Sequence, residues 1–363
     1  MPDTPVFMLF ADCVLVRGAA RSALYDLGRN KLVSFSSAYH DLILRLSGRS
    51  LEAAAAELDS DEQRTGLQRL VAWLIANEFG AWTRHAAAFP AIRTEWRPSS
   101  VIHNAIVDVR SVRHDFASLF RELDALGCEF VQIRAYSTLL SLADVDALAA
   151  HAEHKNLRGV EILLPHDPTA YPDAALLELA VRRRIVSKLI VHSAPEDRVL
   201  TVSDDIPDSA TRRHVYFIAD RISGASHCGQ ISQRTLSAPS TPLFTELQRH
   251  NGCLNGKISI DEQGCIRNCP SMSRSFGELG KTPLAEAAAS PELRSLWRIA
   301  KDQIETCRDC EFRYSCTDCR AYVRTPGNLL SKPAKCGYDP YTGRWSEGAA
   351  QAEATAGYAA STV

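Results

Sequence analysis

Cysteines are concentrated in one part of the chain, and this constrains the fold more than any other feature. Nine of the eleven cysteines in the 363-residue sequence lie from Cys228 to Cys336, and only Cys13 and Cys128 lie outside this block. We expect a reducing, cytoplasmic compartment, because no secretion signal is recognisable at the amino end. The block therefore predicts metal ligation rather than a disulfide framework.

The spacing within the block supports metal ligation. Its members are Cys228, Cys253, Cys265, Cys269, Cys307, Cys310, Cys316, Cys319 and Cys336. Two residues between Cys307 and Cys310 let both thiolates turn onto one ion or cluster. Turn residues such as Gly264 and Pro270 place cysteines in loops, which argues against buried free thiols. Nine cysteines fit two four-thiolate centres with one to spare, and both zinc and iron–sulfur satisfy this count.

The pattern resembles the SPASM domain, a seven-cysteine extension of radical SAM peptide-modifying enzymes. The matching residues run Cys253-x10-Gly264-x4-Cys269, then Cys307-x2-Cys310-x5-Cys316-x2-Cys319, then Cys336. One departure is the gap of two residues before Cys319, where the family usually has a longer one. The resemblance implies two auxiliary [4Fe-4S] clusters, with two zinc ions as the alternative from the spacing alone.

The resemblance also implies which cysteines share a cluster. The second cluster would be held by Cys307, Cys310, Cys316 and Cys336, and the first by Cys253, Cys269, Cys319 and a fourth ligand. That fourth ligand is either Cys228 or Cys265. We favour Cys228, because Cys265 lies beside an expected hairpin turn at residues 261–264, where the family pattern requires no cysteine.

Several longer stretches resemble the SPASM-domain peptide maturase of "grasp-with-spasm" gene clusters. They are HCGQIS, HNGCLNGKISID, NCPSMSRSFG, CEFRYSCTDCRAY and KCGYDPYTGRW, which lie within residues 215–345. In such clusters the maturase accompanies an ATP-grasp ligase and a short precursor peptide. The resemblance thus implies a role in maturing a ribosomally synthesised peptide, with these two partners.

Residues 1–88 are expected to form a winged-helix-like module. Short strands are predicted over residues 6–16, 23–27 and 32–35, and three helices follow them. This order is similar to the PqqD-like element that binds the leader of a precursor peptide along an edge strand, where backbone hydrogen bonds grip the peptide. A winged helix without a ligand and a docking domain for another subunit are the alternatives.

Residues 89–225 are expected to form a linker and a degenerate partial (β/α) barrel. Apolar runs without alternation recur at residues 105–109, 130–133, 160–164, 189–191 and 215–218. Such runs, separated by helical patterns, are typical of a parallel sheet buried on both faces. Five units are too few for a full (β/α)8 barrel, and a partial barrel is what the radical SAM resemblance implies. Gln132 and Arg134, near the end of one strand, are candidate substrate contacts.

The loop after the first barrel strand lacks the radical SAM motif. That motif needs Cys-x3-Cys-x2-Cys, whereas residues 110–114 read Arg-Ser-Val-Arg-His. We therefore expect no SAM-binding cluster, no bound SAM and no radical SAM cleavage. Cys13 and Cys128 are interpreted as buried apolar cysteines.

Composition excludes other classes of function. The net charge is −2, which gives no electrostatic case for a nucleic-acid or membrane partner, and no apolar run is long enough to span a membrane. Residues 226–345 form the SPASM domain in this interpretation, with a helix over residues 283–305 that breaks near Pro291. Residues 346–363 are expected to be a disordered tail.

The whole sequence is thus interpreted as an α/β protein of three parts that helps to mature a peptide beside an ATP-grasp ligase. Catalytic residues are not identifiable, and whether the protein is itself an enzyme is left open. The alternative is a non-enzymatic scaffold that holds the precursor peptide and uses its four-cysteine sites, iron–sulfur or zinc, as structural supports.

Overall fold

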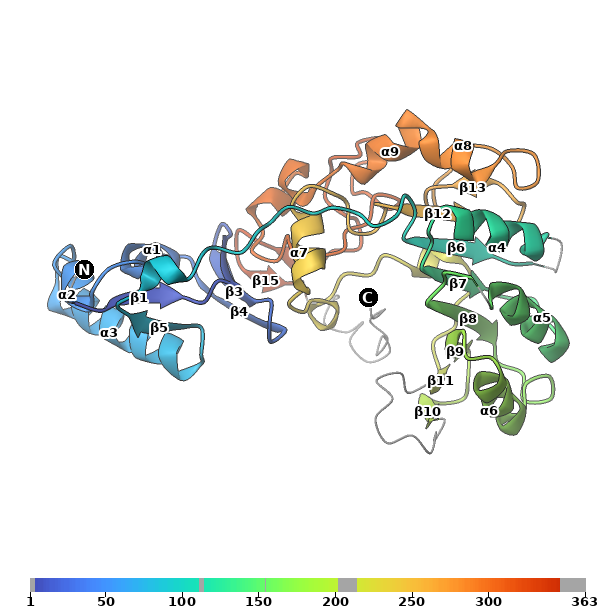
Figure 1. The fold of residues 1–363 in the computed structure, drawn as a ribbon, viewed down its shortest axis with the longest axis horizontal. Helices are drawn as coiled ribbons and strands as arrows, with labels where there is room; N and C mark the ends of the chain where they lie inside the picture. Colours follow the sequence, from blue (N-terminus) through green and yellow to red (C-terminus); the bar gives the residue numbers. More distant parts are fainter. Residues whose placement is uncertain (1–3, 111–113, 154, 202–213, 347–363) are drawn as a thin grey trace.

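The chain has a mixed α/β architecture with a large, mostly parallel sheet. The computed structural model describes residues 4–110, 114–153, 155–201 and 214–346. An amino-terminal module lies at one end of an elongated molecule and the large sheet at the other, with much of the cysteine-rich segment between them (Figure 1). The expected α/β class is confirmed. The expected tail lies almost entirely outside the described residues.

The amino-terminal module combines two small antiparallel sheets with three helices. Strands β2, β3 and β4 form one sheet, and β1 pairs with β5 to form the other. The single strand expected over residues 6–16 is wrong: a turn, in which Cys13 N–H donates to the Phe10 carbonyl (2.9 Å), divides it into β1 and β2. The elements are β1 (Val6–Leu9), β2 (Cys13–Arg17), β3 (Arg21–Asp26), β4 (Lys31–Ser36), α1 (Ala38–Leu46), α2 (Leu51–Ala55), α3 (Asp61–Ala76) and β5 (Gly80–Thr83).

The large sheet contains all five strands expected from the apolar runs. Its order is β10-β11-β9-β8-β7-β6-β12-β13, in which β11 through β12 are parallel and the two edge strands are antiparallel. The non-alternating runs form the central strands, although alternate residues of β6, β7 and β11 are only half-buried, so the two faces of the sheet are not equally covered. The bounds are β6 (Asn104–Asp108), β7 (Phe130–Arg134), β8 (Gly159–Pro165), β9 (Val186–His192), β10 (Arg198–Thr201), β11 (His214–Ile218), β12 (Lys257–Ile260) and β13 (Ile266–Arg267).

Helices between the parallel strands cover one face of this sheet (Figure 1). They are α4 (Phe116–Ala125), α5 (Leu142–Ala152) and α6 (Asp173–Arg182), and they share one apolar core with the strands. Each crossover returns the chain to a parallel neighbour, as in a barrel. The sheet nevertheless stays open, because the edge strands β10 and β13 do not pair with each other in the described part of the chain.

The cysteine-rich segment is built into the same sheet. Strand β12 pairs in parallel with β6, so Lys257 lies opposite Asn104, and β13 follows through a turn in which Gly264 has φ +87°. The helix expected over residues 283–305 is shorter, because it ends at Trp297. The remaining elements are η2 (Ala225–His227), η3 (Gln233–Thr235), α7 (Thr241–Leu247), α8 (Leu284–Ala289), α9 (Pro291–Trp297), η4 (Lys301–Gln303), η5 (Cys307–Asp309), β14 (Tyr338–Asp339) and β15 (Arg344–Trp345).

The amino-terminal module is docked onto the cysteine-rich segment. The buried hydroxyl of Tyr25 in β3 donates to the Glu311 carbonyl (2.7 Å), and Ala19 N–H donates to the Asp309 carbonyl (2.8 Å). Tyr25 also packs against Phe244 of α7, with ring centroids 5.7 Å apart. The loop that carries Cys307 and Cys310 is therefore held in place by the module.

Helices long and apolar enough to cross a membrane do not occur among the described residues.

Candidate metal centre

The first group of cysteines comprises Cys228, Cys253, Cys269 and Cys319. Burial raises the pKa of Cys269 to about 11, and the nearby thiols of Cys253 and Cys228 add to the shift. Burial likewise raises the pKa of Cys319, again with contributions from Cys253 and Cys228. The thiols of Cys269 and Cys319 thus both feel the charges of Cys253 and Cys228, as expected of groups that face one centre.

Different elements bring these four thiols together. Cys228 follows η2, Cys253 precedes β12, and Cys269 follows β13. Next to Cys228, Gly229 has φ +81°, and a Cβ added there would lie 2.8 Å from Cys319 Sγ. Glycine is therefore required where the Cys228 loop passes Cys319, both for its backbone conformation and for the close approach.

The second group comprises Cys307, Cys310, Cys316 and Cys336. Burial raises the pKa of Cys307 to about 11; Lys301 lowers it, while Cys316, Asp318 and Cys336 raise it. Burial also raises the pKa of Cys310 well above its usual range, and Cys316 and Cys307 are among the charges that contribute.

The loop around Cys310 directs a backbone N–H group toward the Cys310 thiol. Phe312 N–H donates to Cys310 Sγ (3.4 Å). An isolated parallel β-bridge between Ile231 and Cys336 brings the chain just after Cys228 beside the second group. The two groups are therefore neighbours in the fold.

Cys265 lies apart from both groups. Its N–H donates to Asp261 Oδ1 (2.8 Å), and its backbone forms an isolated antiparallel bridge with Glu278, which lies after β13. Its thiol is not among the main charges that shift the pKa values of Cys253, Cys269 or Cys319. The residue after Cys228 approaches Cys319 Sγ closely, and the choice between Cys228 and Cys265 as fourth ligand stays a prediction.

A buried ion pair joins the two groups. Lys301 Nζ lies 2.9 Å from Asp318 Oδ1, and Arg320 Nε lies 2.6 Å from Asp318 Oδ2. Burial alone would raise the pKa of Asp318, but Lys301 and Arg320 hold it below its usual value. The charge of Asp318 helps to raise the pKa of Cys253 in the first group and of Cys316 in the second.

Asn251 extends this connection toward the first group. Its Nδ2 donates to Asp318 Oδ2 (2.6 Å), while its Oδ1 accepts from Cys253 N–H (3.1 Å). Sequence reasoning did not identify Lys301, Asp318 or Asn251 as site residues. The available signal was that Asp318 stands between Cys316 and Cys319 and adopts φ +70°, a conformation that Asp and Asn tolerate better than most residues.

The spacing of the thiols is wider than a preformed zinc site requires. A tetrahedral zinc ion with Zn–S bonds of about 2.3 Å places its sulfurs about 3.8 Å apart. Among the described residues, the cysteines of the block do not form a group of three or more ligand atoms within 4.8 Å of one another.

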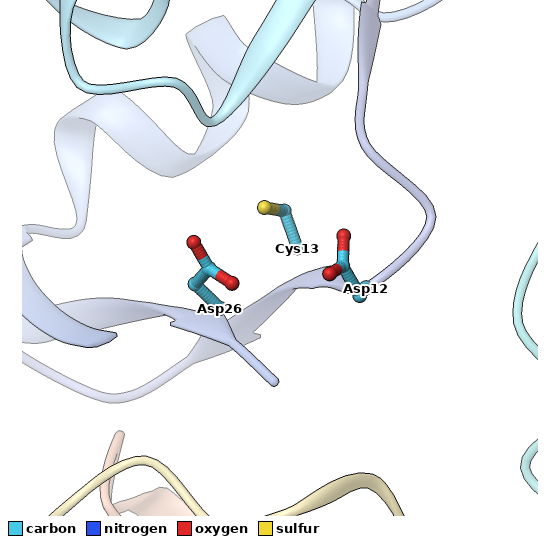
Figure 2. A group of neighbouring side chains, drawn as sticks. All are labelled: Asp12, Cys13 and Asp26. Atoms are coloured by element: carbon cyan, nitrogen blue, oxygen red, sulfur yellow. The ribbon is translucent and has the colours of Figure 1, made fainter. Parts of the chain in front are cut away.

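The group that does meet this distance limit is Asp12, Cys13 and Asp26 in the amino-terminal module (Figure 2). Arg29 balances its charge, because Arg29 Nε lies 2.7 Å from Asp26 Oδ2 and Arg29 N–H donates to Asp26 Oδ1 (2.9 Å). Burial raises the pKa of Cys13 to about 12. We interpret this group as part of the turn before β2. Cys13 and Cys128 are both buried, as expected, although Cys13 has carboxylate neighbours.

A polar cluster lies at the carboxyl ends of β6 and β7. Arg134 Nε donates to Asp108 Oδ1 (2.7 Å), and the Tyr136 hydroxyl donates to the same oxygen (3.3 Å). Burial raises the pKa of Asp108 even though Arg134 opposes the shift. The charge of Cys228 contributes to raising the pKa values of Arg134 and Tyr136. The first cysteine group therefore faces this edge of the sheet.

The two candidate substrate contacts differ in their surroundings. Arg134 is buried, and its Nη2 has no hydrogen-bond partner among the described residues. Gln132 Nε2 instead donates to Glu161 Oε2 (3.1 Å), one strand away. The loop in which a radical SAM motif was sought falls partly outside the described residues, at 111–113.

Comparisons with known proteins give little further guidance. No protein-family model matches the chain, and no curated protein is significantly similar to it. Two similar solved structures are Streptococcus suis SuiB bound to S-adenosylmethionine (9% identity, TM-score 0.33, covering 90% of this chain and 99% of that one) and SuiB bound to the precursor peptide SuiA (8%, 0.27, 90% and 98%). TM-scores this low support no conclusion about fold or function, so the proposals below depend on the chain's own residues.

Proposed function

We propose that the chain holds two [4Fe-4S] clusters. The first would be bound by Cys228, Cys253, Cys269 and Cys319, and the second by Cys307, Cys310, Cys316 and Cys336. The observation that carries this proposal is the gathering of eight thiols in two neighbouring groups around the Lys301–Asp318 ion pair. Bound clusters would supply electron storage or transfer, and the chain's own residues would shield and position them.

The donors around the thiols support iron–sulfur clusters over zinc. Lys257 Nζ lies 3.8 Å from Cys253 Sγ, and Lys301 Nζ lies 3.7 Å from Cys307 Sγ. Thiolate-bound clusters carry net negative charge, and N–H donors to sulfur stabilise it and tune the reduction potential. Each group contains such a lysine.

The proposed role is maturation of a ribosomally synthesised peptide beside an ATP-grasp ligase, without radical SAM cleavage. The resemblance of residues 215–345 to grasp-with-spasm maturases supports this role. The amino-terminal module also supports it, because β2 and β4 each leave one edge unpaired among the described residues. A leader peptide can add to such an edge through backbone hydrogen bonds. The module's contact with Glu311 would hold that peptide near the second cysteine group.

A non-enzymatic scaffold is the second candidate function. Four thiolates saturate each proposed centre and leave no position at the metal for a substrate. The Asp108 carboxylate, at the carboxyl edge of the sheet, already accepts hydrogen bonds from Arg134 and Tyr136. On this reading the metal sites stabilise the fold, and the ligase performs the chemistry.

Mass spectrometry of a precursor peptide separates these two functions. The anaerobically purified protein would be incubated with a candidate precursor peptide, with a reductant, and with or without the ATP-grasp ligase. A change of mass without the ligase is expected of a maturase. A change that needs the ligase, and that C316S protein still promotes, would contradict the maturase and favour the scaffold.

Hydrogen exchange tests the recognition role separately from catalysis. When the same peptide is added, amides of β2 or β4 should gain protection, because an added strand covers one free edge. Amides of α3 serve as an internal control and should not change. Protection confined to the large sheet, or none at all, would refute recognition by the amino-terminal module.

A further inference from the structure

A cavity of about 320 Å³ lies next to the Cys253 segment, because His250 and Asn255 in its lining flank that cysteine, but none of its lining residues is a cysteine. It opens where the linker before β6 crosses the end of α9. His103, which immediately precedes β6, and Gly256, which immediately precedes β12, both line it. The cavity is therefore at the amino ends of these parallel strands, opposite the edge that carries Asp108 and Arg134.

Aromatic rings form the walls of this cavity. The Trp96 ring lies 4.7 Å from that of His250 and 5.6 Å from that of His103, measured between centroids. Trp297 of α9 completes the lining. The His103 ring is packed against Gly256, where an added Cβ would collide with it. The walls are thus fixed in place and suit a flat apolar group.

The charge of the cavity is positive. Arg294 and Arg298 line it, and the lining contains no aspartate or glutamate. Arg294 Nε donates to the Ala288 carbonyl (2.7 Å), but within the described ranges neither arginine forms an ion pair with a carboxylate. Burial lowers the pKa of His250, and Arg298 and Arg249 lower it further. Two cationic guanidinium groups therefore lack an anionic partner.

A buried donor in the wall also lacks a partner. Trp297 is only 9% exposed, and its Nε1 forms no hydrogen bond in the described part of the chain. An indole N–H can only donate, so it requires an acceptor oxygen. Because the Nε1 atom itself is buried, a ligand in the open cavity would contact the Trp297 ring rather than this donor.

We propose that this cavity binds a small aromatic carboxylate. Its ring would lie against the tryptophans, and its carboxylate would accept from Arg298. The volume is near the lower limit of small-molecule sites, about 300 Å³, and matches one aromatic residue. The ligand is either a free acid or the carboxyl-terminal aromatic residue of a peptide, because both present the same ring and carboxylate. This inference does not depend on the proposed metal clusters.

Calorimetric titration of the full chain tests the proposal with three probes. N-acetyl-L-phenylalanine should bind, and N-acetyl-L-phenylalaninamide, which lacks the negative charge, should bind at least tenfold more weakly. A hexapeptide that ends in phenylalanine distinguishes the sources. Tenfold tighter binding than the free acid supports a peptide terminus, and equal binding supports a free acid. Absence of binding by the acid and the hexapeptide, or equal binding of acid and amide, would overturn the proposal.

Two matched variants locate the binding. Arg298→Gln should weaken binding of N-acetyl-L-phenylalanine at least tenfold. Arg249→Gln removes the same charge beside His250 without touching the cavity lining, and should change the affinity less than twofold. The exposed Arg298 has no ion pair to lose among the described residues, so folding is expected to be unaffected. Equal affinities of the two variants would contradict the assignment.

Discussion

The ammonium group of Lys301 lies 2.9 Å from the carboxylate of Asp318, and both side chains are buried where the two cysteine groups meet. Arg320 and Asn251 contact the same carboxylate. Asp318 therefore neutralises two buried cations and links the loops of Cys253, Cys316 and Cys319. We interpret Asp318 as the residue that fixes the positions of the two cysteine groups relative to each other.

Asp318→Asn should destabilise the fold strongly. The amide keeps the size of the side chain and tolerates φ +70°, but it leaves Lys301 and Arg320 without a carboxylate. Loss of one partner from a buried ion pair costs about 3–5 kcal/mol. Urea denaturation of the anaerobically purified protein measures this change in the free energy of unfolding.

Glu278→Gln is the matched control for that experiment. It removes the carboxylate of an exposed pair, in which Lys281 Nζ lies 2.8 Å from Glu278 Oε2. An exposed pair contributes about 0–1 kcal/mol. Similar decreases in the free energy of unfolding of the two variants would show that Asp318 stabilises the fold no more than an exposed carboxylate does.

The fourth ligand of the first cluster can be assigned by comparing two serine variants. Cys228→Ser should lower the iron content from about eight to about four per chain, because one [4Fe-4S] cluster loses a ligand. Cys265→Ser should retain about eight, since Cys265 lies in the β12–β13 hairpin, apart from both groups. Loss of iron in C265S with retention in C228S would reverse the assignment.

Gly229→Ala should disturb the first cluster while sparing the second. An added Cβ would lie 2.8 Å from Cys319 Sγ, so either the Cys228 loop or Cys319 must move. Gly327→Ala is the control, because Gly327 has nearly the same φ, +83°, but open space around the added atom. Iron analysis should show about half the iron in G229A and the full amount in G327A. Equal iron in the two variants would mean that the close approach is unimportant.

Alkylation should distinguish ligands from free thiols. In the native protein at pH 8, iodoacetamide should modify Cys265 and spare Cys228, although Cys228 is the more exposed thiol. Cys128 should also stay unmodified, because burial raises its pKa to about 12 and the reactive thiolate is scarce below that pH. Its labelling should increase only as the pH approaches 12 or after unfolding. Rapid labelling of Cys228 would exclude it as a ligand.

The five parallel strands were predictable because their apolar runs do not alternate. Strand β12 was not predicted: its four residues Lys257–Ile260 mix polar and apolar types, and its partner β6 is about 150 residues earlier in the sequence. Local pattern carries no information about such a distant pairing. The break between β1 and β2 was missed for a related reason, since residues 6–16 are apolar throughout apart from the turn.

The candidate site was only partly predictable. Short spacing identifies cysteines that share a metal centre only when they lie in the same loop. Cys307 and Cys310 meet this condition, so they could be paired from the sequence. The sequence already favoured Cys228 for the first group, although it is distant in sequence from the other members, and the close approach of its neighbour Gly229 to Cys319 comes from the fold. Lys301 and Asp318 were missed because charged residues are normally exposed.

Metal analysis of the anaerobically purified wild-type protein tests the central claim most directly. Iron, acid-labile sulfide and zinc would be measured per chain, together with the visible absorption spectrum. The account predicts about eight irons, about eight sulfides and a brown absorbance, as expected of two [4Fe-4S] clusters. About two zinc ions with no colour would contradict it and make the cysteine groups structural zinc sites.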